Sequence, residues 1–158
     1  MDRLEQLRHV IDEIVRSNPD KEEARCGFVH LYGVSAVCTI LALKRGLDSE
    51  LCAVAGMLHD IWNYQHSVHL EHGPLGSVEA NKILHDLGCF SEAEISTICD
   101  AIALHGQKET TDGEMAELLK DADVFQHYLY NPQMYMAFQH SDARMLRLKK
   151  VKAELGIA

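Results

Sequence analysis

The run from Leu51 to Leu58 constrains the fold more than any other part of the chain, because it contains only apolar residues and one glycine. A helix that is hydrophobic on all sides has to be surrounded by other elements, so this run predicts the central helix of a bundle. The pair His59-Asp60 follows it directly. Burying an ionised carboxylate beside an imidazole is costly unless something compensates, and a divalent metal suits these two ligand types.

Helical spacing of apolar residues continues along the rest of the chain, whereas strand signals such as an Asn-Gly hairpin or sustained alternation are absent. Capping residues, glycines and prolines divide the chain into seven expected helices. These are expected at about residues 2–16, 21–44, 49–60, 74–87, 91–105, 113–128 and 132–154, with residues 62–71 as a loop. The prediction is an all-α, single-domain helical bundle of about six or seven helices over residues 1–158.

The composition narrows the classes of function. The chain has 158 residues, enough for one domain with a substantial core, and its formal net charge of −9 argues against nucleic-acid or anionic-membrane partners. No apolar run is expected to approach the roughly 20 residues of a membrane span, and the N-terminus does not resemble a signal peptide. Four of the five cysteines lie inside apolar helical patterns, where they are expected as small core residues in a reducing compartment, so a cytoplasmic protein is predicted. No Cys-x-x-Cys pair occurs, which disfavours a thiolate zinc site. A homo-oligomer is possible, because the first and last helices could form a dimer surface instead of packing on the bundle.

Helical phase indicates which polar residues point inward. His30 lies on the apolar stripe of its helix, and His105 continues the isoleucine stripe of the fifth helix. Asp123 lies on the core face of the sixth helix, whereas Asp121 shares a face with glutamates and is expected to face water, as is the basic segment 144–152. A lone inward histidine is more often a satisfied core residue or a helix cap. Several inward polar groups on separate helices, however, are what a metal site in a bundle core requires.

The order His30, His59-Asp60, Asp123 resembles the H…HD…D signature of the HD-domain superfamily of metal-dependent phosphohydrolases. Five stretches are similar to the family's motifs: His30–Val34, Ala55–Ile61, His72–Gly76, Ala101–His105 and Asp121–Asp123. The resemblance covers about residues 26–128, which is most of the chain. It implies an HD core over these residues, with the helices expected at 2–16 and 132–154 packed on it.

The resemblance also implies one or two divalent metal ions (Fe, Mn, Zn, Ni or Co), because the ligands are imidazoles and carboxylates without thiolate. A first metal would be bound by four residues, which are His30, His59, Asp60 and Asp123. A second metal would be bound by His72 and His105, with Asp60 bridging the two ions. Asp60 is also the expected catalytic residue, because it would orient the water that attacks phosphorus.

The implied activity is hydrolysis of a nucleotide or another small phosphate ester, and Lys108 and, more weakly, Arg25 are candidate contacts to its phosphate. Asn63 stands where some subgroups of the family need an acid, Gly106 replaces a second histidine, and Gly33 stands where an arginine is frequent. These departures from the family's pattern leave the identity of the substrate open, whereas the expected metal ligands are all present. Two alternatives stay open: a mixed-valent di-iron oxygenase on the same fold, and a regulatory or binding domain that retains the metal without turnover.

Overall fold

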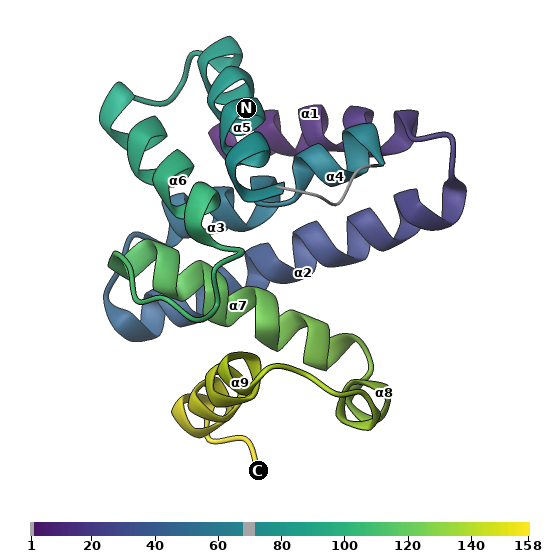
Figure 1. Cartoon of the computed structure of the whole chain (residues 1–158). Helices are drawn as coiled ribbons and strands as arrows, with labels where there is room; N and C mark the ends of the chain where they lie inside the picture. Colours follow the sequence, from purple (N-terminus) through teal and green to yellow (C-terminus); the bar gives the residue numbers. More distant parts are fainter. Residues whose placement is uncertain (1, 68–71) are drawn as a thin grey trace.

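The computed structural model describes residues 2–67 and 72–158, and within these ranges every regular element is a helix (Figure 1). The all-α prediction is therefore confirmed. The helices are α1 (Arg3–Ser17), α2 (Lys21–Arg45), α3 (Ser49–Leu58), α4 (Ile61–His66), α5 (His72–Leu87), α6 (Glu92–Leu104), α7 (Glu114–Tyr130), α8 (Pro132–Ala137) and α9 (Asp142–Leu155).

A tight chain reversal joins α2 to α3. Gly46 ends α2 with a φ of 71°, the left-handed conformation that glycine adopts at little cost. The Asp48 carboxylate then accepts hydrogen bonds from two backbone N–H groups in the first turn of α3. The two helices approach closely at Gly56, where a Cβ atom would lie 2.8 Å from the Cα atom of Ser35. This packing brings the end of α3 beside the middle of α2.

α3 is the central helix that the apolar run predicts. Its residues from Cys52 to Leu58 are all buried, and it packs against α1, α2, α6 and α7. α1 packs across α2, α3, α4 and α5, while α5 and α6 pack side by side and α9 lies on α7 (Figure 1). The pair His59-Asp60 at the end of α3 consequently lies where several helices meet.

Two helix predictions were wrong in detail. Most of the described part of the expected loop 62–71 is a short helix, α4, in which Ile61 and Asn63 are buried. Residues 68–71 of the expected loop lie outside the described residues. The expected helix 132–154 is interrupted between α8 and α9, because the Ser141 side chain caps a new helix by accepting the N–H of Arg144. The interruption lets α9 lie on α7 instead of continuing away from α8.

The face of α7 that carries Asp121 was expected to be exposed, and this prediction was wrong. Asp121 is fully buried, and its carboxylate accepts hydrogen bonds from Arg45, Arg147 and Lys150 at 2.8 to 2.9 Å. Two of these cations belong to α9, whose basic segment was expected on the outer side. Because α9 covers this face and supplies the opposite charge, the carboxylate is buried in an ion-pair network.

The expectation that no apolar run approaches the length of a membrane span was wrong for α2. Residues 26–43 contain no Asp, Glu, Lys or Arg, so α2 is long and apolar enough to cross a membrane by length and composition alone. Half of its most apolar stretch is buried inside the bundle. A core helix passes the same test, and α2 packs here as a core helix against α3 and α7.

Candidate metal centre

The structure brings together all six predicted metal ligands from five helices or helix ends. His30 lies in the middle of α2, and Asp123 lies in α7. His59 is the C-cap of α3 and is fully buried, with Asp60 directly after it. The remaining two are the first residue of α5, His72, and the C-cap of α6, His105.

One group of side chains surrounds the Nε2 atoms of His30 and His59, which lie 3.0 Å apart. Asp60 Oδ2 is 3.3 Å from each of these nitrogens. Asp123 Oδ1 lies 3.5 Å from His30 Nε2 and 3.8 Å from His59 Nε2. Imidazole nitrogens and carboxylate oxygens at such distances can share one divalent ion.

A second group lies on the other side of the Asp60 carboxylate. Asp60 Oδ1 is 3.3 Å from His105 Nε2 and 3.9 Å from His72 Nε2. The two oxygens of Asp60 therefore face two different sets of imidazoles. This is the position that a carboxylate bridging two metal ions would occupy.

The hydrogen bonds on the far side of the rings determine where the imidazole lone pairs point. His59 Nδ1 is 2.8 Å from the carbonyl oxygen of Gly56, and His105 Nδ1 is 2.7 Å from that of Ile102. A carbonyl oxygen only accepts, so each Nδ1 must donate and the neutral ring presents an Nε2 lone pair to the centre. His30 Nδ1 is likewise 2.7 Å from Gln126 Oε1.

These lone pairs test whether a metal fits the site. The Nε2 atoms of His30 and His59 face each other at 3.0 Å, so a proton or a metal ion has to lie between them. Within the described part of the chain, the buried Oδ1 atoms of Asp60 and Asp123 accept no hydrogen bond. Buried polar atoms are normally paired, and divalent cations would satisfy these groups: one between His30, His59 and Asp123 Oδ1, and one beside Asp60 Oδ1. The donor set therefore fits a divalent metal.

Charge coupling within the centre shifts the ionisation of its members. Burial lowers the pKa of the His59 imidazole, but the carboxylates of Asp60 and Asp123 outweigh it and raise this pKa from 6.5 to about 10. Burial opposes ionisation of both carboxyls, yet the positive charges of His59 beside Asp60 and Lys108 beside Asp123 hold their pKa values well below 3.8. Burial lowers the pKa of His105 below 6.5. In the metal-free protein the His59 imidazole is therefore protonated at neutral pH, and the proton on Nε2 lies where a metal ion would bind.

The two predicted phosphate contacts lie in different surroundings. Lys108 is buried, and its Nζ donates hydrogen bonds of 2.6 Å to Asp123 Oδ2 and to the carbonyl oxygen of His105. It therefore touches a predicted metal ligand. Arg25 is exposed and donates to Glu22 and, at 3.4 Å, to the hydroxyl of Tyr130. It lies outside the cluster of six ligands.

Two residues of the centre were missed by the sequence reasoning. His127 Nε2 lies 3.3 Å from Asp123 Oδ1, and its ring centroid is 4.7 Å from that of His30. The spacing of Asp123 and His127 by four residues, which places both on one helix face, could have indicated it. Gln126, which accepts from His30, fills the space beside Gly33 and has no comparable signal in the sequence.

The comparisons with known proteins identify the family and the fold. Residues 27–128 match the family model of the HD domain. The chain belongs to the HD-domain family. A solved structure of a predicted HD superfamily hydrolase from an uncultured Thermotogales bacterium has the same fold, with a TM-score of 0.66 and 20% sequence identity over 99% of this chain and 94% of that one. No curated protein matches the chain. HD domains bind divalent metals, and membership places the chain in a superfamily of metal-dependent hydrolases.

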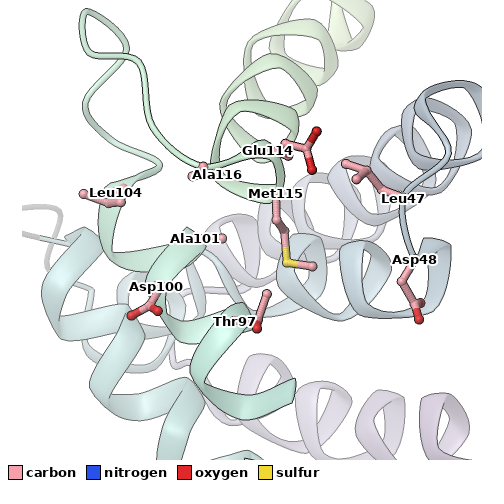
Figure 2. Close-up of a pocket in the computed structure, with 10 residues that line it drawn as sticks. Leu47, Asp48, Thr97, Asp100, Ala101, Leu104, Glu114, Met115 and Ala116 are labelled. Carbon is pink, nitrogen blue, oxygen red and sulfur yellow. The ribbon is translucent and has the colours of Figure 1, made fainter. Parts of the chain in front are cut away.

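A small cavity of about 180 Å³ opens beside the metal centre. Its walls come from α2, α4 and α7, and the lining residues are Cys26, His30, Tyr64, Gln126, His127 and Tyr130. A larger hollow of about 370 Å³ between the ends of α3, α6 and α7 contains Met115 and Thr97 (Figure 2). None of the predicted ligands lines the larger hollow. Of these two cavities, the smaller one adjoins the candidate metal centre, because His30 lines it.

Proposed function

We propose that this protein is a metal-dependent phosphohydrolase that hydrolyses a nucleotide or another small phosphate ester. The observation that carries the proposal is the convergence of four imidazole Nε2 atoms and two carboxylates, whose Oδ1 atoms accept no hydrogen bond within the described residues. This convergence lies in the core of an HD-family bundle. The intact set of candidate ligands disfavours the alternative of a regulatory or binding domain without turnover.

The proposal assigns each ligand a place. His30, His59, Asp60 and Asp123 would hold one divalent ion, and His72 and His105 would hold a second one shared through Asp60. When bound, such ions supply Lewis acidity that activates a water nucleophile and offsets charge on the phosphoryl oxygens. Asp60 has an oxygen facing each ligand set and would orient the attacking water and accept its proton.

Residues around the centre would bind the ester itself. His127 is half-exposed at the cavity wall, where its imidazole would donate a hydrogen bond to a phosphoryl oxygen. Tyr64 and Tyr130 line the same cavity and present aromatic rings to the organic group of the ester. Aromatic walls favour a planar group such as a nucleobase. Arg25, which contacts the Tyr130 hydroxyl, would bind a phosphate only at the rim.

The test begins with the metal content of the purified protein, measured by elemental analysis. Phosphate release is then assayed across nucleotides and simple phosphate esters, with each candidate metal added in turn. The Asp60→Asn variant is expected to lose both bound metal and phosphate release. Asp100→Asn, an exposed carboxylate on α6, is the matched control and should keep both. Unchanged metal content in Asp60→Asn would refute the assignment.

A second candidate function draws on the same arrangement. Asp60 between two imidazole sets is a geometry for two metal ions, and two irons with dioxygen would define the oxygenase alternative. Consumption of dioxygen by the iron-loaded protein, with no phosphate release under anaerobic conditions, would favour this alternative. Anaerobic phosphate release with Mn²⁺ would favour the hydrolase.

A further inference from the structure

The C-terminal helix α9 lies outside the residues that match the HD domain, yet one of its side chains reaches the segment that enters the metal centre. Arg147 is buried, and its guanidinium donates from Nε to the carbonyl oxygen of Lys108 at 2.9 Å. From Nη2 it donates to the carbonyl oxygen of Thr110 at 3.1 Å. Arg147 thus bonds to the backbone of the segment between α6 and α7 at two points.

The same guanidinium is anchored on α7. Its Nη1 donates to Asp121 at 2.9 Å and to Glu117 at 3.0 Å. Lys120 holds the segment from the other side, donating to the carbonyl oxygen of Thr110 at 3.0 Å and pairing with Asp112. Residues 108, 110 and 112 of this segment are therefore held to α7 and α9 by buried or partly buried, charge-assisted hydrogen bonds.

The consequence of this anchoring appears at Asp123. Lys108 belongs to the anchored segment, and its ammonium donates a hydrogen bond of 2.6 Å to Asp123 Oδ2. Asp123 Oδ1 is left without a hydrogen bond among the described residues, and it faces the Nε2 atoms of three imidazoles, those of His30, His59 and His127. Lys108 thereby determines which oxygen of Asp123 is available to a metal.

We propose that Arg147 is a positioning residue for the metal centre: by holding the backbone of residues 108–110, it keeps Lys108 on Asp123 and Asp123 turned toward the imidazoles. The inference rests on the proposed metal function. A guanidinium offers several N–H groups in a fixed plane, so it can bond to two carbonyls and two carboxylates together, which a lysine ammonium cannot do. Partners that orient metal ligands typically contribute about 10-fold to 100-fold to metal affinity.

The test measures Mn²⁺ affinity by isothermal titration calorimetry in a double-mutant cycle. Arg147→Lys keeps a positive charge near Asp121 and Glu117 but removes the guanidinium hydrogen bonds to the carbonyl oxygens of the segment. Lys108→Met removes the ammonium with little change in volume. Each variant is expected to bind Mn²⁺ at least about 10-fold more weakly. The double variant should be no weaker than Lys108→Met, because Arg147 acts through Lys108.

Lys150→Met is the matched control, since Lys150 also lies on α9 and donates to Asp121, whereas the hydrogen bonds to the backbone of the segment come from Arg147 and Lys120. Its Mn²⁺ affinity should equal that of the wild type. Amide hydrogen exchange of the metal-free protein gives an independent readout: Arg147→Lys should lose protection in residues 106–113, and Lys150→Met should keep it. Thermal melts confirm that each variant is folded before titration.

Several results would overturn the inference. Wild-type affinity in Arg147→Lys would do so, and so would losses that add in the double variant or unchanged protection of residues 106–113. A rise in affinity on Lys108→Met would also overturn it, because charge repulsion by the ammonium would then outweigh any orienting role. A wild-type protein that binds no divalent metal would instead refute the proposed function, and this is seen before any variant is compared.

Discussion

Metal binding at this centre should release one proton, and the source of that proton is His59. The imidazole has a pKa of about 10 in the metal-free protein, because two carboxylates stabilise its charged form. Its Nε2 atom faces the predicted metal position, so the proton must leave before the nitrogen can bind an ion. Asp60 and Asp123 contribute no proton, since their pKa values lie well below 3.8.

The size of the effect follows from this pKa. About three pH units separate it from pH 7, and one unit corresponds to about 1.4 kcal/mol, so removing the proton at pH 7 costs about 4 kcal/mol. The apparent affinity for Mn²⁺ should therefore rise about 10-fold per pH unit, or about 100-fold between pH 6.5 and pH 8.5.

Calorimetric titration at each pH, repeated in two buffers with different ionisation enthalpies, measures both the affinity and the number of protons released. We expect about one proton per first metal ion. His85→Gln is the control, because His85 is exposed on α5, has a raised pKa and lies away from the centre. It should leave the proton count unchanged. A proton count near zero, or an affinity independent of pH over this range, would refute the charge assignment of the centre.

Three further outcomes follow from the packing and charges. Gly56→Ala should destabilise the protein by about 1–3 kcal/mol in urea unfolding, because the new Cβ would lie 2.8 Å from the Cα of Ser35; unchanged stability would show that α2 and α3 can separate freely. Asp121→Asn should cost about 3 kcal/mol by the same assay, since it removes the buried negative charge that pairs with three cations, and a loss below about 1 kcal/mol would contradict this. The metal-free protein should lose stability as pH rises from 6.5 toward 10, because the raised pKa of His59 stabilises the folded state fully only below 6.5; thermal melts that are flat across this range would count against it.

Much of the fold could be predicted because the residues that form a helix, and those that begin and end it, are close together in the sequence. The apolar run before His59 predicts a central helix, and the caps at Asp48 and Ser91 mark helix starts that the structure retains. The break before α9 was missed, because the pattern of residues 132–154 reads as helix on both sides of Ser141. Propensity alone does not say where a chain must turn to cover a neighbouring helix.

The sequence by itself determined most of the helices and the inward direction of His30 and Asp123, because helical phase is a property of one segment. The set of six predicted ligands came from the resemblance to the HD-domain family. The tertiary structure alone decided the burial of Asp121, since a face of α7 becomes interior only when α9 packs on it. It also decided that Lys108 contacts Asp123 and that Arg147 holds the segment carrying Lys108. These contacts join residues 15 and 39 positions apart, and no periodicity within a helix encodes such a meeting.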